Sequence, residues 1–387
     1  MRIYQAADEE AILARGQVKD WAGEGLLSES QEQVLGPETE CSLRRTNVFL
    51  RIVLFLFTLL IVSALVGFVF LLFMERASTS TVGIFWLFCA GASYLVAEMA
   101  VSEAKLYRYG TEEALALAAV GYLALGSAAL FGGDAFLFSS SENVGRLVAA
   151  LMGTVSSLWI WYRFGLAYFM LVAMGCAAVV PSYWNLPAGM YQVCLGGVYG
   201  VGLGVVMRQR GRYRYSHLER QYGIAEALLW LGVYFAMHLP THGVWSIGRP
   251  LFWASWVLVW CLPGVALWRG IRLRDHFVIG AGMIGALVTL ATNRLYFGWP
   301  GHSWDAMVLG ALLIGVALVL RRWLAAGPEE IRHGFTARRL SGKDKQWMEV
   351  ATTVIGLTAE TPQAPKASAQ PQFGGGDSGG GGASSDW

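Results

Sequence analysis

The sequence has little charge and no motif that fixes a biochemical activity. Only 14% of its 387 residues are charged, against about 25% in an ordinary soluble domain. The net charge of +2 says nothing about nucleic acid, because only the placement of the charges matters. A glycine-rich run at 196–204 is apolar, so it is neither a P-loop nor a dinucleotide-binding fingerprint. We therefore predict no cofactor.

Cysteine is scarce and scattered. The chain has five cysteines and no CxxC pair. Four of them lie inside apolar stretches, where a thiol behaves as a small hydrophobic group. This spacing predicts neither a disulfide framework nor a zinc site. The five are Cys41, Cys89, Cys176, Cys194 and Cys261.

Metal-binding and nucleophile motifs are missing as well. His238 and His242 have the four-residue separation of a helical metal pair, but Pro240 lies between them. The glutamate of the HExxH zinc motif is also absent. Ser303, in Gly301-His-Ser303, lacks the strand–turn–helix context of a hydrolase. We predict no metal and assign no catalytic residues, which favours a non-enzymatic role and leaves an enzyme as an alternative.

The chain is instead rich in apolar and aromatic residues. Hydrophobic residues make up 55% of it, including 16 Trp, 15 Tyr and 19 Phe, and the mean hydropathy is +0.46. A membrane-spanning helix needs about 20 apolar residues. We identify ten candidate runs, some a little short, and predict an all-α polytopic bundle of about ten transmembrane spans. The runs are 48–73, 82–99, 114–131, 146–162, 164–180, 188–207, 224–239, 251–268, 277–292 and 306–320.

The fourth and fifth runs share a short junction around Arg163 and could form one long helix. Charge favours two spans, because basic residues concentrate on the cytoplasmic side of a membrane protein. With ten spans and both termini cytoplasmic, fifteen basic residues lie at inner junctions and four lie outside, at Arg76, Arg146, Arg249 and Arg294. The fifteen are Arg44, Arg45, Lys105, Arg108, Arg163, Arg208, Arg210, Arg212, Arg214, Arg220, Arg269, Arg272, Arg274, Arg321 and Arg322.

The most basic junction is "VMRQRGRYRYSHLERQYG", at 206–223. Its arginines predict a cytoplasmic topology anchor, because each costs about 2.5–3.5 kcal/mol at the centre of a membrane helix. Near the surface each basic residue can also contribute about 1 kcal/mol toward anionic headgroups. We therefore expect membrane lipids as partners and no nucleic acid. The five anchor residues are Arg208, Arg210, Arg212, Arg214 and Arg220.

Few ionisable or small residues inside the spans suggest a specific role. Glu98 and Glu226 are candidate intramembrane ionisable groups near the inner ends of their runs. Pairing with an arginine such as Arg108 or Arg220 would explain them without a proton relay. Glycines that recur every four residues would let another helix approach closely. This predicts helix packing at Gly196, Gly200 and Gly204.

The loops expected outside carry polar and aromatic residues that could line a shallow ligand pocket. An aromatic belt at the interface explains the tryptophans and tyrosines equally well. The pocket supports two alternative functions, a transporter or lipid-handling protein and an intramembrane enzyme using its histidines. The candidate pocket residues are His238, His242, Arg294, His302 and Asp305.

The two ends of the chain are polar and predict cytoplasmic segments. Residues 1–46 indicate a helical hairpin, with a stop at Gly25 and a capping box from Ser28 to Gln31. The ten-span bundle is expected over 47–324. A segment with an amphipathic helix follows at 325–358. The Gly-rich tail at 359–387 lacks the apolar content to fold, which predicts disorder.

The opening "WAGEGLLSESQ" at 21–31, before many apolar runs, resembles a family of bacterial multi-pass predicted membrane proteins of unknown function. The similar part covers about a tenth of the chain. The resemblance implies a bundle of roughly eight to twelve spans in a bacterial inner membrane, and no catalytic residues follow from it. The sequence thus favours an integral inner-membrane protein that is a non-enzymatic scaffold or accessory factor of an envelope process. Its hairpin or tail would meet a cytoplasmic protein partner.

Overall fold

The computed structural model describes residues 2–23, 25–74, 76–132, 144–213, 216–239, 249–297, 305–327, 331–332 and 335–336. The chain divides into two compact units, Met1–Trp323 and Leu324–Trp387. The residues of the predicted hairpin and nearly all of those of the predicted bundle lie in the first unit. In the second unit, the described strands β1 (Ile331–Arg332) and β2 (Phe335–Thr336) form an antiparallel pair.

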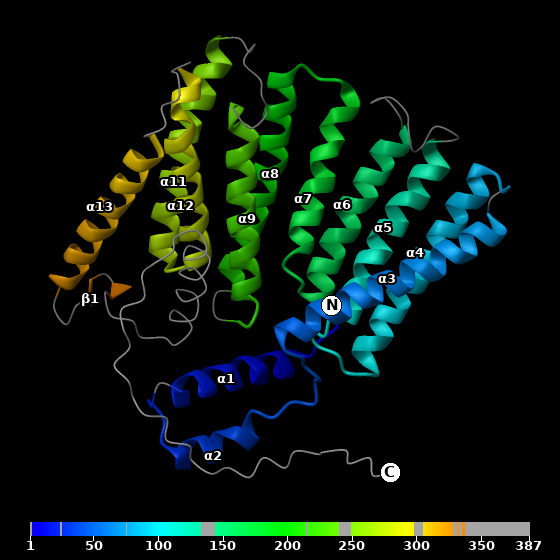
Figure 1. The fold of residues 1–387 in the computed structure, drawn as a ribbon, viewed down its shortest axis with the longest axis horizontal. Helices are drawn as coiled ribbons and strands as arrows, with labels where there is room; N and C mark the ends of the chain where they lie inside the picture. The colour runs from blue at the N-terminus through cyan, green and yellow to red at the C-terminus, as the bar shows by residue number, and fades with distance from the viewer. Residues whose placement is uncertain are drawn as a thin grey trace, which may run out of the picture. The chain divides into compact units, whose positions relative to one another are not determined.

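The rest of the described chain is helical, as predicted (Figure 1). Each of the ten apolar runs forms a helix of its own. The helices are α1 (Ala6–Gly23), α2 (Glu29–Glu38), α3 (Val48–Phe73), α4 (Thr79–Ser102), α5 (Thr111–Gly132), α6 (Val144–Phe164), α7 (Phe169–Val179) with the 3-10 helix η2 (Val180–Trp184), α8 (Ala188–Arg212), α9 (Glu219–Met237), α11 (Arg249–Leu273), α12 (His276–Tyr296) and α13 (Asp305–Ala325).

Seven described helices are long and apolar enough to cross a membrane. They are α3, α4, α5, α6, α8, α11 and α12. The apolar helix over Phe169–Trp184 is shorter. No residue of α3 is buried, although it is the most apolar of the seven. An apolar helix surface that faces outward is what contact with hydrocarbon requires. The chain is a multi-pass membrane protein.

Local sequence signals fix the ends of the N-terminal helices. Gly25 has a φ of +72° and donates its N–H to Ala22, while Leu26 donates to Trp21. These two bonds form the Schellman motif that ends α1, so the predicted stop at Gly25 is confirmed. At the start of α2, Ser28 and Gln31 form the predicted capping box, which is also confirmed.

Residues 146–180 form two helices rather than one, and Gly165 lies at the break. Its φ is +72°, a left-handed conformation that only glycine adopts without strain. A Cβ there would lie 1.9 Å from Nη2 of Arg2, so a larger residue would also displace the N-terminal segment. Figure 1 shows α6 and α7 side by side on either side of this turn.

The connections that carry most basic residues meet at one end of the first unit, which we call the basic end. The Arg44 N–H donates to Lys105 at 2.8 Å, and the Ile3 N–H donates to Arg163 at 3.0 Å. Nη2 of Arg210 lies 2.5 Å from Asp275. Figure 1 shows α1 and α2 beside the same end.

Candidate functional site at the basic end

A buried ion-pair cluster joins four helices at the basic end. Glu226 on α9 is fully buried and accepts from Nη1 of Arg210 on α8 at 3.0 Å. Arg269 on α11 donates to its other oxygen. Arg210 also pairs with Asp275, the residue that caps α12. Two guanidinium groups and two carboxylates thus neutralise one another, which makes their burial tolerable.

Gly223 leaves the space that this cluster occupies. A Cβ at this position would lie 2.5 Å from Oδ2 of Asp275 and 3.5 Å from Nη2 of Arg210. The other Asp275 oxygen accepts the Phe277 N–H at 2.8 Å, so the carboxylate is held on both sides. The arrangement positions helices. It leaves neither Glu226 nor Arg210 as a spare acid or base.

Arg210, predicted to be a topology anchor that could also meet lipid headgroups, does not lie at the surface of the first unit. Arg210 lies on the buried face of α8, in register with Leu203 and Val206, and only 5% of its surface is exposed. Arg208 and Arg212 are exposed, as an anchor requires. The guanidinium of Arg220, also exposed, lies 5.8 Å from the centre of the Phe277 ring. Arg214 lies outside the described residues.

Neither intramembrane glutamate pairs with the arginines suggested by the sequence. Glu226 instead forms ion pairs with Arg210 and Arg269. Glu98 accepts from Nε of Arg163 at 2.9 Å and from the Tyr94 hydroxyl at 2.6 Å. Trp159 in turn donates to the Tyr94 hydroxyl at 3.0 Å. Glu98 therefore connects α4 to α6.

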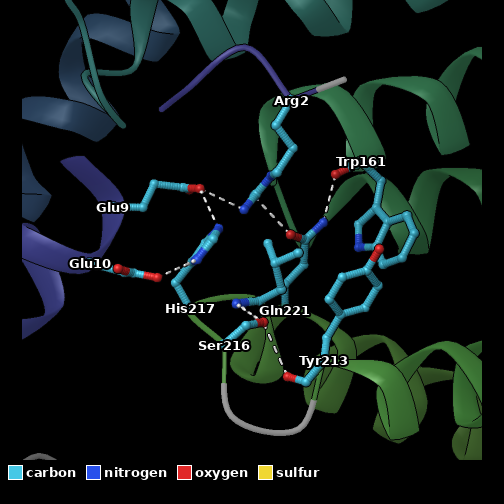
Figure 2. Close-up of polar contacts among 9 residues, drawn as sticks. Arg2, Glu9, Glu10, Trp161, Tyr213, Ser216, His217 and Gln221 are labelled. Atoms are coloured by element: carbon cyan, nitrogen blue, oxygen red, sulfur yellow. Dashed lines mark hydrogen bonds and ion pairs between the residues drawn. The ribbon is translucent and has the colours of Figure 1, made fainter. Parts of the chain in front are cut away.

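The N-terminal segment is tied to the basic end by a second polar cluster, which we call the N-terminal junction (Figure 2). Arg2 donates from Nη1 to Glu9 at 2.7 Å and from Nη2 to Gln221 at 2.8 Å. Gln221 also binds α6, because its Nε2 donates to the Trp161 carbonyl at 2.7 Å. Side chains of α1 and α9 and the backbone of α6 are thus linked through one arginine.

His217 lies between two carboxylates in the N-terminal junction. Its Nε2 is 3.2 Å from Glu9 and its Nδ1 is 3.4 Å from Glu10. Burial raises the pKa of Glu9, and the charges of Arg2, His217 and Arg108 oppose that rise.

The sequence did not suggest this junction. On α1, Val18 is buried, whereas Trp21 is 45% exposed. Glu9 and Ile12 complete the buried face. A buried glutamate on an otherwise apolar face was the available signal, because such a group needs a partner. That partner, Arg2, also contacts a residue more than two hundred positions away.

At the other ends of α9 and α12 the candidate pocket residues are only partly described. His238 is 1% exposed, and its Nε2 lies 2.7 Å from the Thr292 hydroxyl. Arg294 is half-buried two residues further along α12. His242 and His302 lie outside the described residues, as does the side chain of Asp305. The pocket stays a prediction, with His238 placed inside the helix packing.

Of the three glycines predicted to pack closely on α8, one lies against another helix and two do not. A Cβ on Gly196 would meet the end of the Met237 side chain at 2.1 Å. Gly200 and Gly204 have nothing within 4 Å of that position. The face of α8 that packs is instead marked by buried large residues, because side-chain volume rather than glycine spacing fills the interface. These residues are Gln192, Leu195, Tyr199, Leu203, Val206 and Arg210.

A small cavity lies among the described helices. A cavity of about 10 Å³ between α9, α11 and α12 is lined mainly by apolar side chains. That volume holds about one water molecule at most. No group of three or more His, Cys, Asp and Glu residues in the described ranges could hold a metal ion.

Comparison with protein-family models, with curated proteins and with solved structures finds no match to this chain.

Proposed function

We propose that this chain is a non-enzymatic scaffold or accessory protein of an envelope process in the cell inner membrane. The observation that carries the proposal is the N-terminal junction, which holds the helical hairpin at the basic end through side chains. None of the residues of α2 is buried, and Val34 on it is 63% exposed. In this hairpin α1 is held by the N-terminal junction, and α2 is exposed and could bind a partner protein.

The charge chemistry of the described helices supports the same proposal. Glu98, Glu226 and Arg210 are each occupied by contacts between helices. A proton relay or a transport path would need such groups beside water. The transporter or lipid-handling alternative therefore depends on the predicted pocket at His238, His242, Arg294, His302 and Asp305. The intramembrane enzyme alternative depends on its histidines.

Ten spans, with both termini in the cytoplasm, belong to this proposal. The ten separate helices and the gathering of basic connections at one end support it, because basic residues favour the cytoplasmic side. The bacterial family resemblance remains part of the proposal too. Thiol labelling from outside intact cells tests the orientation, with Arg212→Cys expected to be protected and His242→Cys expected to react. Labelling of position 212 alone would overturn it.

Complementation of a deletion strain separates the functional classes. We expect removal of residues 6–38 to abolish complementation, while His238→Ala and Arg294→Ala retain it at equal membrane levels of protein. The tail at 359–387 is deleted separately, because it is the second candidate contact for a partner. If the hairpin and tail deletions both complement while His238→Ala fails, the scaffold proposal is wrong and the enzyme alternative gains support.

A further inference from the structure

Four basic residues cluster where the apolar surface of α3 and α4 ends. The first two, Arg44 and Arg45, precede α3. The other two, Lys105 and Arg108, lie in the turn between α4 and α5. All four are exposed.

The backbone holds the two segments together. Arg44 and Leu106 form a parallel β-bridge, in which the Arg44 N–H donates to Lys105 at 2.8 Å and the Tyr107 N–H donates to Arg44 at 3.0 Å. Lys105 and Arg108 have φ angles of +54° and +50°. Left-handed backbone in residues other than glycine costs about 1–3 kcal/mol each and persists only where the surroundings impose it. The basic side chains therefore project from a fixed turn.

The cluster is organised around Tyr107, which is 8% exposed. The guanidinium carbons of Arg45 and Arg108 lie 5.9 Å and 5.5 Å from the centre of its ring. Behind it, Tyr4 packs edge-on at 4.9 Å between ring centres. Cation–π contacts stabilise the two guanidinium groups near one point but do not neutralise them.

No carboxylate in the described part of the chain forms an ion pair with any of the four. The contrast with neighbouring Arg51 is clear, because its Nη2 lies 2.5 Å from Oε1 of Glu113. Glu103 is exposed in the same turn and makes no ion pair with them. The Arg108 charge acts on Glu9 without an ion pair, as a minor influence on its pKa. The cluster thus carries an uncompensated positive charge.

The position of the cluster identifies the anion that it fits. Val48 and Phe49, which follow Arg45 after an interval of two residues, are 72% and 77% exposed, and Met99 on α4 is 52% exposed. Such side chains in a membrane protein face hydrocarbon, so the basic residues next to them lie at the level of the phosphates. We propose that Arg44, Arg45, Lys105 and Arg108 form a binding site for the phosphate of an anionic phospholipid.

Positive-inside topology explains on which side of the membrane these residues lie. It does not explain why two of them occupy left-handed backbone, or why two guanidinium groups converge on one buried ring. A fixed phosphate site explains both, since guanidinium groups bind phosphate oxygens with defined geometry.

The test uses the full chain in detergent, titrated with phosphatidylglycerol, phosphatidylcholine or inorganic phosphate and followed by native mass spectrometry. The test variant is R45Q/R108N, because asparagine tolerates the left-handed backbone at position 108. The matched control is R15Q/K19Q, which removes the same charge from exposed positions on α1 that have no predicted lipid role. We expect phosphatidylglycerol affinity to fall by about 10- to 30-fold in the test variant, since each basic residue near the surface contributes about fivefold. The control should lose less than about threefold.

Equal losses in the two variants would overturn the proposal, because they would show diffuse attraction to any basic surface. Equal binding of phosphatidylcholine, or binding of inorganic phosphate as tight as that of phosphatidylglycerol, would overturn it as well. The melting temperature without lipid checks that R45Q/R108N still folds. If that variant is unstable, K105N, with the control K19Q, gives the same comparison one charge at a time, with about a fivefold loss expected.

Discussion

Gly223→Ala places one methyl group against the ion pair between Arg210 and Asp275. Its Cβ would lie 2.5 Å from Oδ2 of Asp275. That carboxylate cannot move away freely, because its other oxygen accepts the Phe277 N–H and its partner Arg210 is buried. Breaking a buried pair costs about 3–5 kcal/mol. Alanine recovers about 1 kcal/mol of helix propensity over glycine, which leaves a net loss of about 2–4 kcal/mol.

The matched control is Gly200→Ala, because nothing lies within 4 Å of a Cβ at that position on α8. It should be neutral or stabilising by up to about 1 kcal/mol. Thermal unfolding of the full chain in detergent measures both variants. We expect Gly223→Ala to melt lower than the control by on the order of 5–10 °C.

Equal melting temperatures for Gly223→Ala and Gly200→Ala would refute the reasoning. A double-mutant cycle identifies the cause of a loss. In an Asp275→Ala background the methyl group has no carboxylate to displace, so Gly223→Ala should then cost less than about 1 kcal/mol. An undiminished cost in that background would show that another contact is responsible.

Three further outcomes are expected. Burial raises the pKa of the Glu9 carboxyl above that of an unfolded glutamate. The stabilisation that results from this difference is complete at a pH below the ordinary pKa of a glutamate, and it is lost as the pH rises through the raised pKa of Glu9. Glu9→Gln should flatten this part of the melting profile, and an unchanged profile would contradict the assignment. Arg2→Gln should loosen α1, seen as faster limited proteolysis within residues 6–23, whereas equal rates would mean that other contacts hold the helix. Glu98→Gln should cost only about 1 kcal/mol or less, because its pair with Arg163 is partly exposed; a much larger fall in melting temperature would indicate a deeper role.

Helices and their ends could be predicted because their causes are local. Long apolar runs placed the helices, Gly25 and the Ser28 capping box marked two ends, and the junction around Arg163 marked the break before α7. The number of membrane spans needs more than this. Seven described helices meet the length and composition of a span, and the other three are part of the proposal.

Partners distant in the chain could not be predicted from the sequence. An arginine at position 210 looks the same in a surface anchor and in a buried pair, and the choice depends on Asp275 and Glu226 on other helices. Helical spacing could have placed Arg210 in register with Leu203 and Val206. The four-residue spacing of the α8 glycines could not show which of them pack against another helix, because exposed and packed glycines recur with the same spacing.

The order of synthesis gives the contact between Arg2 and Gln221 a further consequence. These residues are 219 positions apart, so the ribosome makes the hairpin long before Gln221 exists. The hairpin can meet Tyr107 and Arg163 earlier, through Tyr4 and Ile3, but the contact with Gln221 forms only after synthesis has reached the start of α9. Full attachment of the hairpin therefore reports that the chain has been made at least that far. A partner protein that binds only when the hairpin is attached would not bind incompletely synthesised chains.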